Sequence, residues 1–334
     1  MLTPATQPLN WLWPGRWASG KLTLIDGDPG VGKSLASLDL AARLTSCADM
    51  PDGYRPPSAV PIVLISAEDN LCDTILPRLV AAGADLNLVT TWHANEPLLL
   101  PKDCSTLQQV IEQTHAKLVI LDPFSAFLAS LNDVTIHQAL DPLAELADTT
   151  GAAILLIRHL SKTTAGKQAI YRGLGSIAIL GAVRTAFLIA PDLNAAMTSS
   201  TKPARELASV RDTPCVLACT KNNLAPLCPS LGYRIITAAN GQPQVRWTGI
   251  VNRTADDLTV SAHTRRQTLP AAIALLQDQL ANGSRERDHL VNLARTEGIS
   301  LRTLERAKAQ LGIVSDQRRR HGCNVWYWSL PVHR

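Results

Sequence analysis

The chain has 334 residues, of which 46% are hydrophobic and 18% charged, a composition that excludes a disordered protein and leaves room for one large α/β domain and a small one. Its seven cysteines include no C-x-x-C pair, which argues against a zinc ribbon or a disulfide framework. The net charge of +4 is uneven, because residues 261–334 carry 12 basic and 6 acidic side chains, a balance that points to nucleic acid as a partner of this tail.

No targeting or membrane segment is visible in the sequence. The first residues lack a basic segment followed by an apolar one, and no uninterrupted apolar run is long enough to span a bilayer. We therefore expect a cytoplasmic protein. We interpret the loose cluster of Cys215, Cys219 and Cys228 as core or incidental thiols.

Residues 1–20 form an N-terminal arm that carries Trp11, Trp13 and Trp17 around a Pro-Gly pair. Three large aromatic side chains need a surface to cover them. Two alternatives are open: the arm packs on its own domain, or it docks on a neighbouring subunit.

A glycine-rich loop follows the arm. Its residues are Gly27, Asp28, Pro29, Gly30, Val31, Gly32, Lys33 and Ser34, which fit the P-loop pattern G-x-x-x-x-G-K-[ST]. An apolar run at 22–25 predicts a strand before the loop, and apolar periodicity over 35–44 predicts a helix after it. This context favours a phosphate-binding loop over an ordinary glycine-rich turn. We expect it to bind ATP, with Lys33 at the β/γ-phosphates and the Ser34 hydroxyl on Mg²⁺.

Polar residues follow three further buried strands. The runs are 62–65, 118–121 and 152–157, and they are followed by Glu68 with Asp69, by Asp122 and by His159. Ligands of parallel α/β sheets bind beyond the carboxyl ends of the strands, so these side chains should share one edge with the P-loop. Asp122 then fits the Walker B position, which holds the Mg²⁺ shell through water. His159 is either a γ-phosphate sensor or a structural histidine.

The remaining pattern completes an α/β fold with a mainly parallel central sheet. Helices are expected near 72–82, 105–115, 136–147 and 174–183, strands near 88–91, 184–190 and 215–219, and a hairpin from 233–237 and 244–247. The main domain would span 21–250. The polar residues 251–268 then predict a linker.

Motifs in this order resemble the RecA-fold hexameric helicases, and most closely the small plasmid replicative helicases of the RepA group and their relatives on phages and mobile elements. The likeness covers roughly residues 15–250. It implies a RecA-like P-loop NTPase core of the AAA family ATPases, and a homo-oligomer that is a hexamer in this family.

The resemblance also implies roles for single residues at the strand ends. Residues 27–34 are its Walker A motif and Asp122 its Walker B carboxylate. Glu68 takes the place of the catalytic carboxylate that polarises the attacking water. His159 takes the place of the γ-phosphate sensor, and Arg78 that of a residue facing the adenine.

Two further positions resemble residues that these helicases supply to a neighbouring subunit. Residues 171–184 resemble the stretch that ends in the arginine finger, which makes Arg184 the finger; its ordinary alternative is a salt-bridged strand residue. Lys221 lies in the motif whose lysine reaches the neighbour's nucleotide. Asn223 stands where many ring helicases have a second arginine.

Residues 269–330 lie outside that likeness and predict a winged helix-turn-helix. Helical patterns cover 269–280, 285–297 with Ser284 as its cap, and 301–311 with Ser300 as its cap, and a strand follows at 325–328. The third helix would enter the major groove, with Arg302 and Arg306 near base edges. A wing would place Arg318, Arg319 and Arg320 on phosphates. The alternative is a small helical domain for protein contacts.

Together these patterns predict an ATP-driven DNA motor of replication or mobile-element maintenance that hydrolyses ATP at subunit interfaces. Single-stranded DNA would contact the core through Lys162 and Lys167, and duplex DNA would bind the C-terminal domain. Two rivals are a RecA- or RadA-like recombination or repair ATPase and an ATP-gated DNA-binding regulator or replication initiator that never unwinds DNA.

Overall fold

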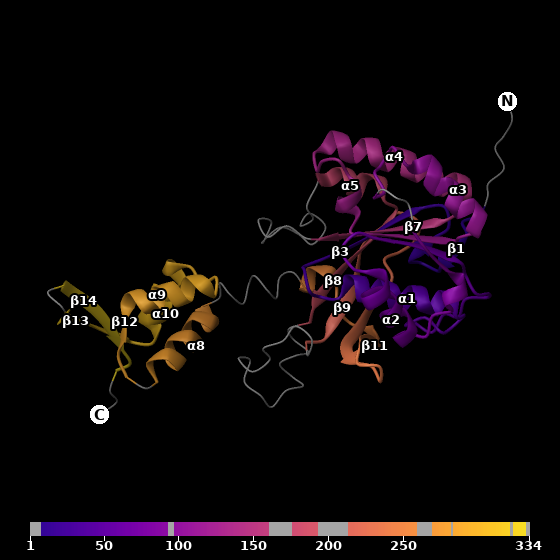
Figure 1. The fold of residues 1–334 in the computed structure, drawn as a ribbon. Helices are drawn as coiled ribbons and strands as arrows, with labels where there is room; N and C mark the ends of the chain where they lie inside the picture. Colours follow the sequence, from indigo (N-terminus) through magenta and orange to yellow (C-terminus); the bar gives the residue numbers. More distant parts are fainter. Residues whose placement is uncertain are drawn as a thin grey trace. The chain divides into compact units, whose positions relative to one another are not determined.

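The computed structural model describes residues 8–92, 97–159, 176–192, 213–258, 269–281, 283–320 and 323–331. The side chains of residues 176, 177, 320 and 323 are outside this description. The chain divides into two compact units, Met1–Leu258 and Thr259–Arg334 (Figure 1).

The first unit is built on one large sheet with the strand order β11-β10-β9-β8-β3-β7-β6-β4-β5. These strands are β3 Leu22–Gly27, β4 Ile62–Ser66, β5 Val89–Thr91, β6 Leu118–Asp122, β7 Ala153–His159, β8 Thr185–Pro191, β9 Cys215–Asn222, β10 Ser230–Thr237 and β11 Pro243–Val251. Neighbours from β8 to β5 are parallel, whereas β9, β10 and β11 continue the sheet antiparallel. The expected α/β fold with a mainly parallel sheet is confirmed.

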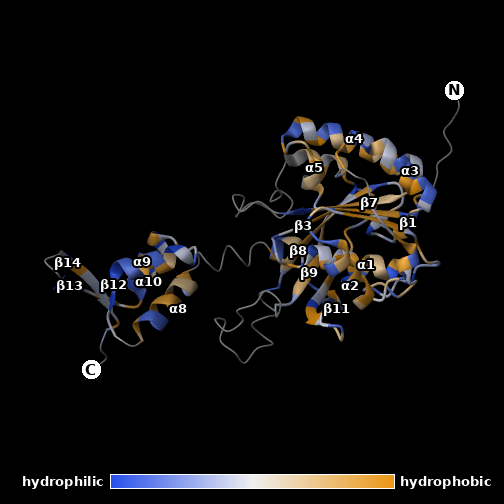
Figure 2. Ribbon diagram, in the orientation of Figure 1, coloured by the Kyte–Doolittle hydropathy of each residue, from blue (hydrophilic) through white to orange (hydrophobic). Residues whose placement is uncertain are grey.

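Helices cover both faces of this sheet (Figure 1). They are α1 Lys33–Thr45, the π-helix η1 Leu71–Ile75, α2 Leu76–Ala81, the 3-10 turns η2 Leu86–Leu88 and η3 Phe124–Phe127, α3 Cys104–Thr114, α4 Asp133–Thr150 and α5 Ser176–Ala182. Successive strand residues point to opposite faces, so Ile25 packs in the core under α1 while Leu24 packs in the core under α3 and α4. Figure 2 shows the resulting band of hydrophobic strands between the helical layers.

The helix expected near 72–82 differs in its first turn. Asn70 caps it by accepting hydrogen bonds from the backbone N–H groups of Cys72 and Asp73, and residues 71–75 form a π-helix before α2. Pro77 lies in the first turn of α2, where its missing N–H costs nothing.

The N-terminal arm forms a two-stranded ribbon of β1 Trp11–Trp13 and β2 Trp17–Ala18. Trp13 and Trp17 meet edge to face with ring centroids 5.3 Å apart, and both are fully buried in the same core as α1. Of the two alternatives for the arm, these side chains follow the first, packing on their own domain. Trp11 is half-buried.

The second unit consists of α8 Leu269–Leu280, α9 Arg287–Thr296, α10 Leu301–Gln310 and a small antiparallel sheet. The sheet has the order β12-β14-β13, with β12 Arg285–Glu286, β13 Val314–Arg320 and β14 Cys323–Ser329. Leu276, Leu290, Leu304 and Trp328 form its core. Ser300 caps α10 as expected, by accepting from the Thr303 N–H.

The start of α9 corrects the sequence interpretation. Ser284 is not the cap; Glu286 occupies that position, because residues 285–286 pair with β14 as a strand before the helix begins. Within the described residues of both units, no helix is long and apolar enough to cross a membrane.

Candidate functional site

The loop between β3 and α1 takes a shape that only glycine adopts without strain. Gly30 and Gly32 have φ values of 82° and 89°, in the left-handed region. A Cβ on Gly32 would also lie 2.8 Å from the Ile235 side chain of β10. The Tyr233 hydroxyl, on the same strand, donates to the Val31 carbonyl at 2.8 Å. The loop therefore packs against β10, which belongs to the antiparallel extension of the sheet formed by β9, β10 and β11.

The same extension holds the helix that follows the loop. The Trp247 indole N–H of β11 donates to Asp39 of α1 at 2.6 Å, and the Arg43 guanidinium contacts the same carboxylate at 2.8 Å. Trp247 of β11 thus connects the middle of α1 to the antiparallel extension of the sheet.

Lys33 points back into its own loop. Its Nζ donates to the carbonyls of Gly27 and Asp28, both at 2.9 Å, and the residue is 4% exposed. Burial lowers the pKa of Lys33 to about 8, against the opposing pull of nearby carboxylates, Asp122 first among them. Within the described residues, the hydrogen bonds of Lys33 Nζ go to two neutral carbonyls. A phosphate oxygen at this loop would therefore meet a desolvated cation, which favours anion binding.

Asp122 lies at the end of β6, beside the start of α1. It is 8% exposed, burial raises its pKa, and a hydrogen bond from the Ser34 hydroxyl and the charge of Lys33 act in the opposite direction. A buried carboxylate beside a hydroxyl offers the hard oxygen ligands that Mg²⁺ prefers. The donor set of Ser34 and Asp122 therefore fits a Mg²⁺ ion, directly or through water.

Glu68 and His159 meet at the same edge from two different strands. Glu68 follows β4 and is 60% exposed in its side chain, while His159 ends β7; His159 Nε2 and Glu68 Oε1 are 3.4 Å apart. In the described part of the chain, the buried Nδ1 of His159 has no hydrogen-bond partner. A carboxylate that faces solvent and is contacted by an imidazole suits a base that takes a proton from water.

A buried ion pair that the sequence analysis missed connects β3 to β7. Arg158 donates from Nε to Asp26 Oδ1 at 2.6 Å and from a terminal nitrogen to Oδ2 at 2.7 Å, and both side chains are almost fully buried. The two residues directly precede Gly27 and His159, and they are register partners on the parallel strands. The pair thus fixes the P-loop against the strand that carries His159. The sequence alone gives no signal for it, because the β3–β7 pairing is not local.

Arg184 and Lys221 lie at the other edge of the sheet. Arg184 precedes β8, and its N–H donates to the Leu22 carbonyl at the start of β3, whereas the P-loop begins at the opposite end of that strand. Lys221 Nζ donates to the carbonyls of Leu180 and Val183, the latter at 2.9 Å. Burial and then the charge of Arg184 lower the pKa of Lys221. The two cations are neighbours, and they lie at the opposite end of the strands from Lys33.

Comparison with known proteins agrees with the motif and its surroundings. Residues 2–165 match the family model described as an AAA domain. A segment of 160 residues, 46% of this chain, is 28% identical to the protein named DNA repair protein RadA from Halalkalibacterium halodurans. That segment spans 31% of the relative's length.

These matches support a P-loop ATPase core. The large, mostly parallel central sheet fits a RecA-like core of this kind. Arg78 lies in the same unit, and its guanidinium contacts the Asp69 carboxylate at 2.7 Å next to Glu68. Its Nε is buried without a partner in the described residues. Whether Arg78 faces an adenine stays a prediction.

The remaining site predictions concern DNA. Lys162 and Lys167 lie outside the described residues. Arg302 and Arg306 are exposed on α10, and Arg318 and Arg319 are exposed on β13; the Arg320 side chain is outside the description. The Arg318 guanidinium lies 4.9 Å from the centre of the Tyr327 ring. The sequence analysis missed Trp326, an aromatic of β14 that is 47% exposed.

Proposed function

We propose that the protein is an ATP-driven DNA motor of replication or mobile-element maintenance that hydrolyses ATP at the interfaces of a homo-oligomer. The observation that supports this most is the separation of the catalytic candidates. Lys33, Asp122 and Glu68 lie at one edge of the sheet, and Arg184 with Lys221 at the other. A second copy that brings its Arg184 edge to this P-loop would complete the site.

Each residue then has a defined task. The loop N–H groups and Lys33 bind the phosphates of ATP. Ser34 and Asp122 would hold a Mg²⁺ ion, which would supply neutralisation of charge on the phosphate oxygens. Glu68 accepts a proton from the attacking water, and His159 orients Glu68 through their 3.4 Å contact. Arg184 of the neighbouring copy stabilises the charge that develops in the transition state.

DNA as the partner is supported by the second unit and by a relative. Three helices followed by an antiparallel hairpin are the elements of a winged helix-turn-helix. In that arrangement α10 would enter the major groove with Arg302 and Arg306, and β13 would place Arg318, Arg319 and Arg320 on phosphates. The relative's name refers to DNA repair.

That name also favours a second candidate, a RadA-like recombination or repair ATPase. An ATP-gated DNA-binding regulator or replication initiator remains a third. The motor predicts strand displacement from a ring-shaped hexamer. The recombination ATPase predicts filaments on DNA, and the regulator predicts ATP-dependent binding without displacement.

One sample can test the proposal. ATP hydrolysis by the full chain would be measured with and without single-stranded DNA, beside its mass in solution and a strand-displacement assay. We expect an oligomer whose ATPase activity rises with single-stranded DNA. A monomer that hydrolyses ATP at full rate and ignores DNA would contradict both the assembly and the motor.

A matched variant tests the DNA surface of the second unit. Replacing Arg318 and Arg319 by Ala in the full chain should weaken duplex binding on all sequences and flatten its salt dependence by up to about two units of slope, because each lost contact releases about one counterion fewer. Replacing the exposed Arg285 of β12 serves as the control. Equal losses in the variant and the control would remove the specific role of β13.

A further inference from the structure

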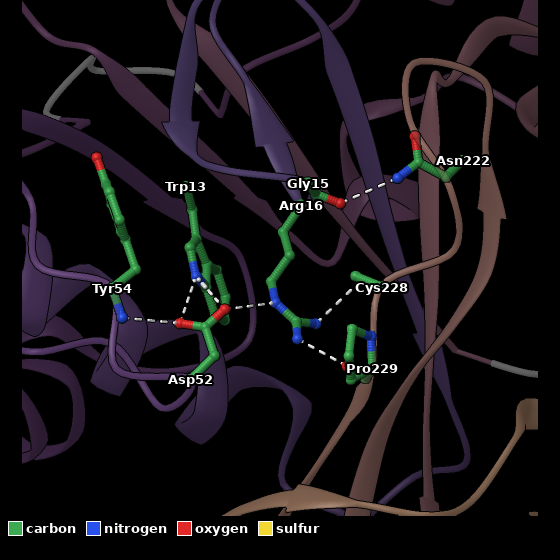
Figure 3. A network of polar contacts seen from close by, with 8 residues as sticks. All are labelled: Trp13, Gly15, Arg16, Asp52, Tyr54, Asn222, Cys228 and Pro229. Atoms are coloured by element: carbon green, nitrogen blue, oxygen red, sulfur yellow. Dashed lines mark hydrogen bonds and ion pairs between the residues drawn. The ribbon is translucent and has the colours of Figure 1, made fainter.

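The loop between β9 and β10 holds a cysteine against a buried arginine (Figure 3). Arg16, which is 1% exposed, donates from Nη1 to the Cys228 sulfur at 3.2 Å and from Nη2 to the Pro229 carbonyl at 2.7 Å. Its Nε contacts Asp52 Oδ2 at 3.2 Å. Arg16, in the N-terminal arm, therefore directs one guanidinium nitrogen at the sulfur of Cys228, which is 212 residues away in the chain.

The Asp52 carboxylate accepts hydrogen bonds from other donors besides Arg16. The Trp13 indole N–H donates to both oxygens of Asp52, at 3.1 and 3.0 Å, and the Tyr54 backbone N–H donates at 3.3 Å (Figure 3). The guanidinium is permanently charged, so the Cys228 sulfur accepts from a cation. A cation beside a cysteine sulfur favours its thiolate form, whereas burial acts in the opposite direction.

A second thiol lies beside the first. Cys219 of β9 is 8% exposed and its S–H hydrogen-bonds the Cys228 sulfur. That bond and then Arg16 lower the pKa of Cys228 to about 7, against burial and the charge of Asp52, while the pKa of Cys219 is raised by the same contact and by burial. One cysteine is thus prepared as a nucleophile and its neighbour is kept as a thiol.

We propose that Cys228 and Cys219 form a redox-active pair that peroxides oxidise to a disulfide. The Cys228 thiolate attacks the peroxide oxygen, the O–O bond breaks, and the products are a sulfenic acid and, after protonation, water or an alcohol. The Cys219 sulfur then attacks the Cys228 sulfur, the S–O bond breaks, and water leaves with the proton of Cys219. Two thiols lose two electrons, and the peroxide accepts them.

The position of the pair links it to the ATPase core. Cys219 precedes Lys221 by two residues, and its S–H also donates to the Lys221 carbonyl at 3.5 Å. Asn222, next in the strand, donates to the Gly15 carbonyl of the arm (Figure 3). A disulfide would therefore join the end of β9, where Lys221 lies, to the loop against which Arg16 packs.

The test uses the full chain and hydrogen peroxide as the oxidant, with peptide mapping by mass spectrometry. We expect a Cys219–Cys228 disulfide that thiol reductants reverse. In Cys219→Ser, Cys228 should instead accumulate as a sulfenic acid that dimedone traps. In Cys228→Ser, Cys219 should stay reduced. These Cys-to-Ser changes are small enough to leave the fold intact, which circular dichroism checks.

Cys72 provides the matched control thiol, because it is exposed while Cys228 is half-buried. At pH 7, iodoacetamide should alkylate Cys228 about tenfold faster than Cys72, because the contacts with Cys219 and with the Arg16 guanidinium lower the pKa of Cys228 and favour its thiolate. The proposal is overturned if Cys72 reacts as fast as Cys228, or if peroxide produces no disulfide between Cys219 and Cys228.

Discussion

The two edges of the ATPase sheet differ in what they hold. The carboxyl edge brings Lys33, Asp122, Glu68 and His159 together around the P-loop. The amino edge holds the cations Arg184 and Lys221, with Arg184 beside a cavity of about 260 Å³ between the start of β3 and α4. One edge can bind and activate a nucleotide, and the other carries charge suited to a transition state without a phosphate loop of its own. This division is what a site shared between copies requires.

The largest expected effect is the loss of ATP binding at the carboxyl edge. Lys33→Ala should abolish ATP binding and hydrolysis together, because it removes the cation that the P-loop carbonyls hold at the phosphates. Calorimetric titration with MgATP and a phosphate-release assay would measure both. Retained affinity in this variant would show that the carboxyl edge binds nucleotide without its lysine.

Arg184→Ala should bind MgATP normally and lose a factor of about 10³ or more in kcat, as removal of an arginine finger does elsewhere. If Arg184 acts on a neighbour, mixing this variant with Lys33→Ala should restore part of the activity. A mixed interface can combine an intact P-loop with an intact Arg184. No recovery in proven mixed oligomers would assign Arg184 a role within its own chain and break the contrast between the edges.

Glu68→Gln should lose a factor of about 10²–10⁴ in kcat while MgATP affinity is kept, because the amide preserves shape but accepts no proton. Single-turnover hydrolysis beside equilibrium binding measures this. Asp69→Asn is the comparison, since Asp69 pairs with Arg78 at 2.7 Å. Normal turnover in Glu68→Gln with slow turnover in Asp69→Asn would transfer the role of base to Asp69.

The sequence predicted that Asp122, Glu68 and His159 share an edge with the P-loop, because the signals for this placement are local. A strand, a glycine loop and a helix are adjacent in the chain, and each of Asp122, Glu68 and His159 follows its own apolar run. Parallel strands then bring these ends together without further information. The same reasoning explains why a mainly parallel central sheet was predicted.

Contacts between distant segments were not predictable in this way. The Asp26–Arg158 pair depends on β3 lying beside β7, and the Arg16–Cys228 contact joins residues 212 positions apart. Cys219 and Cys228 were interpreted, together with Cys215, as core or incidental thiols, because no local pattern indicates that Arg16 lies beside Cys228. Strand order and loop placement are set by the packing of the whole sheet, and no local pattern encodes them.

Lys33 and Lys221, whose pKa values are both lowered, allow the finest comparison of the edges. Burial lowers the pKa of Lys33 to about 8 and lowers the pKa of Lys221 as well. When the folded pKa of a lysine lies below its unfolded value, the unfolded chain binds more protons between the two values. The free energy of unfolding therefore rises with pH between the folded and the unfolded pKa. At pH values below the folded pKa, the buried lysine is charged and its desolvation lowers the free energy of unfolding by the full amount.

For Lys33 the window runs from about pH 8 to 10.5, and the rise amounts to about 3 kcal/mol. Lys33→Met should remove this rise, which urea unfolding of both proteins at several pH values would measure. Lys221→Met should remove a smaller one, because Lys221 is half-buried whereas Lys33 is 4% exposed. Equal pH slopes in wild type and Lys33→Met would mean that Lys33 is not desolvated in the folded chain. The contrast between the edges would then rest on Arg184 alone.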